Sequence, residues 1–206
     1  MNRNYVFVPE NEYAPEKKRI ESILMKVHEL VEPYFKFSHT YVGSTDRGLI
    51  TRDKNNCTGY DFDVNIHVNA KAKKYSPEEI KKIMMAAVDS CSHEYGYSKC
   101  EDSKRVFTIS KQIHINSKET VSCDFAIVND WSKDQQWIIL HDFNQNTYKW
   151  DKLPQSDKEL ERRADQIKQD GRWDEVRELY ICKKNTDGNP NNKSRSLYAA
   201  TINEIF

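Results

Sequence analysis

The hydrophobic residues of the chain repeat with two different periods. Between residues 60 and 68 (YDFDVNIHV) apolar and polar residues alternate, which is typical of a β-strand with one buried face. Residues 15–34 instead place apolar side chains three and four positions apart, as an amphipathic helix does. The same reasoning predicts further strands at 5–8, 35–42, 104–109, 111–116, 119–128 and 135–141.

Two capping-box sequences mark the starts of helices. Ser76 begins the first (SPEE), and this helix should run to about Glu94. Ser156 begins the second (SDKE), which Gly171 can end. Two more helices are predicted at 172–184 and 194–205, separated by a loop over 185–192.

The order of these elements predicts the fold class. Helices and strands mix in the first part of the chain, whereas helices alone follow the last strand. This order is typical of an α+β protein with a mixed β-sheet and flanking helices. We expect a sheet domain over residues 1–150 and a small C-terminal helical lobe over residues 151–206.

Composition narrows the range of functions. The 206 residues include 32 Lys and Arg against 32 Asp and Glu, so the chain lacks the basic excess of a dedicated duplex-DNA binder. Five cysteines without a C-x-x-C pair argue against a disulfide framework and against a zinc–thiolate site. No apolar run approaches the length of a membrane span, and we expect a soluble, cytoplasmic protein.

The candidate chemistry lies on the strand at 60–68. Asp61 and Asp63 share one face of it and repel each other, so a cation such as Mg²⁺ should bridge them. Asp124 interrupts an apolar strand, which is costly without a partner. If that strand lies beside 60–68, three carboxylates can hold two metal ions that clamp the oxygens of a displacement at phosphorus.

Gly43 and Ser44 follow the strand at 35–42. A glycine lets the backbone approach a phosphate closely, and the serine hydroxyl can donate to it. Each feature also has an ordinary explanation. Asp61 and Asp63 can be solvated acids, Asp124 can pair with Lys or Arg, and Gly43-Ser44 can be a plain turn.

Taken in order, Val42, Gly43-Ser44, Asp61-Phe62-Asp63 and Asp124 resemble the polymerase-β-like nucleotidyltransferase superfamily. The match covers roughly residues 40–128, and its long spacer after Ser44 is similar to that of some bacterial cyclic-oligonucleotide synthases. The resemblance implies a mixed-sheet nucleotidyltransferase core and an NTP donor, ATP or GTP, whose triphosphate lies over Gly43 and Ser44.

The resemblance also implies the metal and the base. Two Mg²⁺ or Mn²⁺ ions would be held by Asp61 and Asp63, with Asp124 as a ligand and as the base for the acceptor hydroxyl. In the cyclic-nucleotide branch a lysine and a helix-opening serine touch the phosphates, and an aromatic residue stacks on the base. Residues of similar type and place here are Lys184, Ser196 and Tyr198.

The leading hypothesis is transfer of a nucleoside monophosphate from an NTP to a hydroxyl acceptor, with release of pyrophosphate. A nucleotide, an RNA, a protein and a small molecule all remain open as acceptors. Two alternatives are an Asp-x-Asp glycosyltransferase and a degenerate nucleotide- or RNA-binding module without turnover. The lysines of residues 71–74 (KAKK) are typical of a solvated loop, and they are also able to contact a nucleic-acid acceptor.

Overall fold

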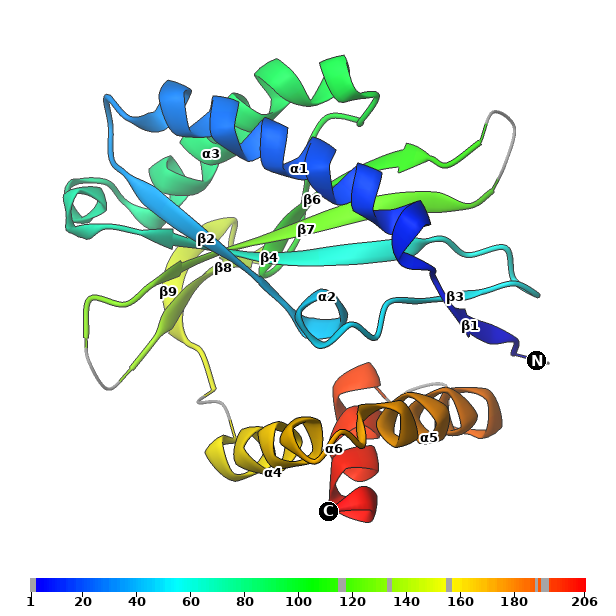
Figure 1. Ribbon diagram of the computed structural model, residues 1–206. Coiled ribbons are helices and arrows are strands. Elements are labelled where there is room, and N and C mark those ends of the chain that lie inside the picture. The colour runs from blue at the N-terminus through cyan, green and yellow to red at the C-terminus, as the bar shows by residue number, and fades with distance from the viewer. Residues whose placement is uncertain (1–2, 115–117, 133–134, 155–156, 188, 190–192) are drawn as a thin grey trace.

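A mixed β-sheet forms the centre of the computed structural model, which describes residues 3–114, 118–132, 135–154, 157–187, 189 and 193–206 (Figure 1). Within these residues the sheet has seven strands, five of them in the order β2-β4-β7-β6-β5, and β8 pairs with both β7 and β9. Only the pairing of β4 with β7 is parallel among these described strands. The strands are β2 (Phe37–Val42), β4 (Tyr60–Val68), β5 (Glu101–Asp102), β6 (Val106–Gln112), β7 (Thr120–Asn129), β8 (Trp137–Asp142) and β9 (Thr147–Lys152).

Two helices cover one face of the sheet. α1 (Glu10–Val31) and α3 (Pro77–Ser92) lie side by side above it, and their apolar stripes bury the apolar face of β4 (Figure 1). The alternation predicted for β4 is confirmed, because Phe62, Val64 and Ile66 are buried while the residues between them are not. The capping box of α3 is confirmed as well: Ser76 Oγ accepts from Glu79 N–H at 3.2 Å and Glu79 Oε2 accepts from Ser76 N–H at 2.7 Å.

Several short elements complete the sheet domain. β1 (Tyr5–Phe7) pairs antiparallel with β3 (Thr51–Asp53). The five-residue helix α2 (Gly43–Arg47) directly follows β2. The 3₁₀ helices η1 (Ala70–Lys74) and η2 (His93–Tyr95) follow β4 and α3.

The C-terminal helices form a lobe below the sheet (Figure 1). α4 (Lys158–Gln169), α5 (Trp173–Thr186) and α6 (Ser194–Ile205) share their own apolar cluster. Leu49, which follows α2, is part of that cluster, so the lobe packs directly against the sheet domain. Arg177 on α5 donates to the Gly48 carbonyl at 2.6 Å, which joins the same two parts.

The structure confirms the predicted α+β class, but it corrects several boundaries. α1 begins at Glu10, five residues before Pro15 rather than at it, and so contains the proline. One strand, β6, spans the junction of the two predicted at 104–109 and 111–116, since its ladder with β7 continues unbroken to Gln112. Residues 115 and 116 of the second prediction lie outside the described residues. Ser156 lies outside the described residues, and Asp157 caps α4 by accepting from Leu160 N–H at 3.1 Å. No helix in the described residues combines the length and apolar content needed to cross a membrane.

Candidate functional site

Three carboxylates lie on neighbouring strand positions, on the face of the sheet that looks towards the lobe. Asp61 and Asp63 alternate with buried residues of β4, so both point away from the α1–α3 layer. In the parallel register between β4 and β7, Asp63 lies directly beside Asp124. The condition stated from the sequence, that the strand of Asp124 lies beside residues 60–68, is therefore met.

Gly43 packs against this cluster. β2 ends opposite Asp63, since Val42 pairs with Asp63 in the antiparallel register. The next residue, Gly43, has φ +67°, a conformation that L side chains rarely adopt. A Cβ at this position would lie 2.5 Å from Asp63 Oδ2, so the backbone approaches the carboxylate more closely than any other residue type allows.

The electrostatics of the cluster follow from burial and like charge. The pKa of Asp63 is raised to about 7 by burial and by the charges of Asp61 and Asp124, against an opposing effect of Arg47. Burial also raises the pKa of Asp124, although the Thr108 hydroxyl donates to its Oδ1 at 2.5 Å and acts the other way. The carboxylates therefore lack full compensation of their negative charge within the protein.

The donor set fits a hard divalent cation in chemistry, because all three ligands would be carboxylate oxygens. The positions of these carboxylates fit an ion less well than their chemistry does. Among the described residues no group of three or more His, Cys, Asp or Glu side chains is arranged to hold an ion. The three carboxylates are neighbours on the sheet, yet they have not converged on one point.

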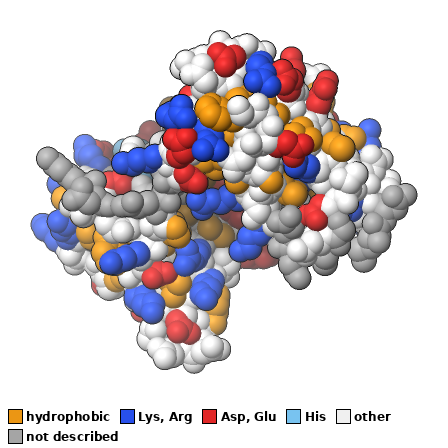
Figure 2. Space-filling view, turned by 90° about the horizontal axis from the view of Figure 1, so that it is seen from below, with side chains coloured by type: hydrophobic (Ala, Val, Ile, Leu, Met, Phe, Trp, Pro, Cys, Tyr) orange, Lys and Arg blue, Asp and Glu red, His pale blue; other side chains and the backbone are white. Residues whose placement is uncertain are grey.

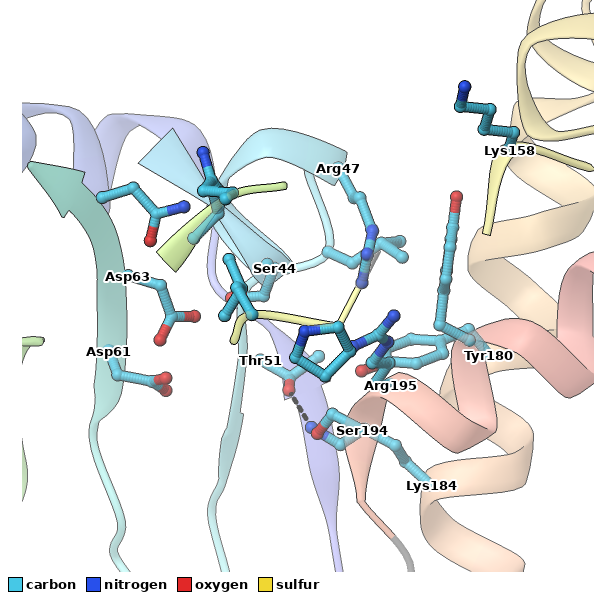
Figure 3. A pocket seen from close by; sticks show the side chains of 18 of the residues that line it. Ser44, Arg47, Thr51, Asp61, Asp63, Lys158, Tyr180, Lys184, Ser194 and Arg195 are labelled. Atoms are coloured by element: carbon cyan, nitrogen blue, oxygen red, sulfur yellow. Dashed lines mark hydrogen bonds between the residues drawn. The ribbon is translucent and has the colours of Figure 1, made fainter. Parts of the chain in front are cut away.

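A cavity of about 1250 Å³ separates the acids from the lobe. Asp61 and Asp63 point into it from β4, while Lys184 and Arg195 approach from the helices (Figure 3). Seen from the lobe side, Lys and Arg side chains lie near the middle of this face (Figure 2). The pocket thus places a cationic wall opposite an anionic one.

Lys184 is the most constrained of these cations. Its Nζ donates to Thr51 Oγ1 at 2.7 Å and lies 4.5 Å from the centre of the Tyr5 ring (Figure 3). Burial lowers its pKa, and the negative charge of Asp61 opposes that shift. Arg47 also lines the cavity, and its guanidinium lies 4.0 Å from the centre of the Tyr198 ring.

No protein-family model matches the sequence, and no curated protein matches it. Solved structures do match. The CD-NTase CdnG of Bradyrhizobium diazoefficiens, in complex with GTP, gives a TM-score of 0.58 at 12% identity over 96% of this chain and 67% of that chain. The cyclic AMP-GMP synthase DncV of Vibrio cholerae, in complex with the linear intermediate 5′ pppA(3′,5′)pG, gives 0.62 at 12% identity over 97% and 67%. The GTP-bound form of DncV gives 0.59 at 16% identity over 96% and 52%.

The chain has the polymerase-β-like nucleotidyltransferase fold. The predicted likeness to the cyclic-oligonucleotide synthase branch is thus confirmed at the level of the fold. The chain spans about half to two thirds of the length of these neighbours.

Within this fold, most of the residues singled out from the sequence surround one pocket. Those that line it are Gly43, Ser44, Asp61, Asp63, Lys184 and Tyr198. Asp124 lies beside Asp63 on the neighbouring strand. Ser196 is exposed and is not among the lining residues, whereas Ser194 and Arg195 of the same helix are.

Sequence reasoning missed other cations of the pocket, of which Arg47, Lys158 and Arg195 are examples. One signal was available for Arg47. It lies three residues after Ser44, which is one helical turn, so a helix starting at Gly43 turns both toward the same side. Lys158 carried no comparable signal, because the packing of the lobe under the sheet brings it to the pocket.

Proposed function

We propose that this chain is a metal-dependent nucleotidyltransferase that moves a nucleoside monophosphate from an NTP to a hydroxyl acceptor and releases pyrophosphate. The observation that carries the proposal is the parallel register that puts Asp63 beside Asp124, with Gly43 packed against Asp63. The nucleotidyltransferase fold supports it, as do the solved neighbours that hold GTP.

The donor triphosphate would lie between Gly43-Ser44 and the cationic wall. The backbone at Gly43 has no side chain to hold phosphate away, and Lys184 and Arg195 offer charge from the opposite side. The donor would be ATP or GTP, and Tyr198 would stack on its base. The exposed Ser196 keeps a proposed role at the triphosphate, which Ser194 is better placed to fill.

Asp61, Asp63 and Asp124 would hold the metal ions, which we take to be two Mg²⁺ or Mn²⁺. Bound there, divalent cations supply charge neutralisation for the phosphates and for the crowded carboxylates. The raised pKa of Asp63 supports this assignment, because it reports negative charge that the protein itself does not balance.

Asp124 would accept the proton of the acceptor hydroxyl. Its Oδ1 already accepts from Thr108, which fixes the orientation of the carboxylate and leaves Oδ2 for the incoming proton. Burial raises the pKa of Asp124, and a higher pKa makes a carboxylate a stronger base. The remaining catalysis would come from positioning the two substrates in the cavity.

The two parts of the chain would divide this work. Residues 1–150 would carry the acids as the catalytic sheet domain, and residues 151–206 would close the pocket as the helical lobe. The five free cysteines support a cytoplasmic location, where thiols stay reduced.

The test is release of pyrophosphate from each of the four NTPs, with Mg²⁺ or Mn²⁺ and with a pool of cell RNA, protein and nucleotides as acceptors. We expect Asp61→Ala and Asp63→Ala to lower the rate by at least about 100-fold. Asp151→Ala, on strand β9 and not among the residues that line the pocket, removes a carboxylate of the same type and should leave the rate unchanged. Full activity in Asp63→Ala would contradict the proposal.

Two other results identify the alternatives. Transfer of a sugar from a nucleotide sugar, with no NTP turnover, would indicate a glycosyltransferase. Tight NTP binding without turnover under every condition would indicate a degenerate binding module.

A further inference from the structure

A second cavity, of about 550 Å³, lies at the end of the sheet where β4 meets η1. It is formed by the start of β2, the end of β4 and the segment after β7. We call it the basic groove and define it by the side chains used below: Lys36, Ser38, His67, Lys73, Asp130 and Trp131. The function proposed above makes no use of it.

The basic groove continues the catalytic pocket. Asp130 lines both cavities. His67 lies on the same face of β4 as Asp61 and Asp63, four residues beyond Asp63, which is about 13 Å along the strand. His67 Nδ1 contacts Asp130 Oδ2 at 2.8 Å, so this pair forms the boundary between the two cavities.

The charges of the groove favour an anionic occupant. Lys36 and Lys73 are both exposed, and Lys71 and Lys74 lie beside them on η1. Lys36 pairs with Glu32 at 2.9 Å on the surface, a contact that competes weakly with a phosphate. The Asp130 carboxylate is the one acid among the side chains that define the groove, and it is hydrogen-bonded: Gln136 Nε2 donates to it at 2.6 Å and His67 contacts its other oxygen.

Trp131 gives the groove an aromatic surface. The indole N–H donates to the Val68 carbonyl at 3.2 Å, and the ring meets Trp150 edge-on at 5.3 Å, so its orientation is fixed. Lys73 Nζ lies 5.2 Å from the centre of the ring. A fixed aromatic plane beside lysines is the combination that binds single-stranded nucleic acid, since bases stack on the ring and phosphates contact the cations.

We propose that the acceptor is the 3′ end of a single-stranded polynucleotide whose preceding nucleotides occupy the basic groove. This inference rests on the proposed function. The terminal 3′ oxygen attacks the α-phosphorus of the NTP and gives its proton to Asp124. The new bond joins that oxygen to the α-phosphorus, the bond from the α-phosphorus to its bridging oxygen breaks, and pyrophosphate leaves.

The two cavities adjoin at Asp130, and this arrangement fits a polynucleotide acceptor better than a single nucleotide. A lone acceptor nucleotide would be accommodated with the donor in the 1250 Å³ pocket, leaving the groove without a ligand. A polynucleotide chain carries a phosphate at every residue, so it reaches from the acids past His67 to Lys36 and Lys73.

Binding is measured first, without NTP. The probes are a fluorescent, unstructured single-stranded RNA and a DNA of the same sequence, labelled at the 5′ end, with anisotropy as the readout. We expect the double variant Lys36→Ala/Lys73→Ala to bind about tenfold more weakly than the natural protein. The slope of log affinity against log salt should flatten by about 1.4, because two phosphate contacts are lost.

Lys82→Ala is the matched control. Lys82 pairs with Glu78 one helical turn away, as Lys36 pairs with Glu32, and it lines neither cavity. Trp131→Leu tests the stacking surface and should weaken binding about tenfold as well. Because this change can disturb Trp150, its circular dichroism and melting temperature are compared with those of the natural protein. Equal binding by the double variant and by Lys82→Ala overturns the proposal.

Extension of the same oligonucleotides is measured next, with NTP and Mg²⁺ or Mn²⁺. We expect longer products, none from an oligonucleotide with a 3′-deoxy end, and a raised KM for oligonucleotide in the double variant. If pyrophosphate is released but no oligonucleotide is extended, the acceptor is wrong and the transfer function stands. If the oligonucleotide binds through the groove lysines but no NTP is consumed, the transfer function itself fails, and the acceptor role fails with it.

Discussion

The backbone of Gly43 lies so close to Asp63 that a methyl group at position 43 would sit 2.5 Å from the carboxylate oxygen Oδ2. Such a separation is well below van der Waals contact, so one of the two residues would have to move. The strand register explains the closeness, because Val42 is the partner of Asp63 and the chain turns into α2 immediately afterwards. Position 43 is therefore sterically coupled to the carboxylate that lies deepest in the cluster.

Gly43→Ala should lower activity by displacing Asp63, and Gly48→Ala separates that effect from backbone strain. Gly48 has φ +66°, almost the same as Gly43, but a Cβ there would meet nothing within 4 Å. We expect each substitution to cost about 1 kcal/mol of stability for its positive φ. Gly43→Ala alone should then lower the rate of pyrophosphate release by about tenfold or more, through the misplaced carboxylate. Similar rates in the two variants would show that Gly43 serves only the turn.

Asp63→Asn should stabilise the protein at alkaline pH when divalent cations are absent. The folded protein keeps the proton of Asp63 until about pH 7, whereas the unfolded chain loses it near its ordinary pKa of 3.8. The folded state binds more protons across that window, so stability falls as pH rises through it. The variant escapes this loss, which amounts to at most about 4 kcal/mol.

Thermal melts at pH 4 and pH 8 in EDTA measure this difference. At pH 8 Asp63→Asn should melt higher than the natural protein, by about 2–4 °C for each kcal/mol, and the difference should shrink toward zero at pH 4. Added Mg²⁺ should raise the melting temperature of the natural protein more than that of the variant. If the difference in melting temperature between the two proteins were the same at pH 4 and at pH 8, Asp63 would ionise normally.

Lys184→Met should weaken NTP binding, and Lys183→Met should not. Lys184 Nζ lies in the pocket, bonded to Thr51, whereas Lys183 pairs with Glu204 outside it. Methionine keeps most of the apolar stem in both cases, so the comparison isolates the charge. We expect the KM for NTP to rise about tenfold in Lys184→Met, because a charged contact to phosphate is lost. An unchanged KM would remove Lys184 from the donor site.

Ser194 and Ser196 provide a direct comparison between sequence and structure. The resemblance to cyclic-nucleotide enzymes pointed to Ser196. Both serines are exposed, but Ser194 lines the pocket and Ser196 is not among the lining residues. Ser194→Ala should raise the KM for NTP several-fold, by about the value of one hydrogen bond. Ser196→Ala should leave it unchanged. The reverse order would restore the assignment made from sequence.

The sequence was most informative where a single period covered a whole element. The strict alternation of residues 60–68 set both the strand and the face that carries Asp61 and Asp63. The capping box at Ser76 located the start of α3, because its two hydrogen bonds are local. Asp124 was recognisable as the third acid, because a carboxylate within an apolar strand needs a partner.

Elements and residues that depend on distant partners were not predictable in this way. β3 has only three residues, so it carries no apolar period, and its pairing with β1 defines it. β9 is an exception, because Tyr148 and Trp150 alternate with polar residues there and the pattern was overlooked. The cations that line the pocket from the lobe were also not predictable from local sequence. Arg195 and Lys158 reach the pocket only because the lobe packs around Leu49 under the sheet, which no local pattern encodes.

The parallel pairing of β4 with β7 also has a consequence for the order of events during folding. Parallel neighbours cannot be joined by a tight turn, and here α3, β5 and β6 separate the two strands in the chain. Closing so long a loop carries an entropic cost, and contacts of this kind form late. During synthesis Asp61 and Asp63 leave the ribosome well before Asp124, so a nascent chain holds two acids without the third. The three-acid cluster would thus arise in one step, when β7 docks beside β4.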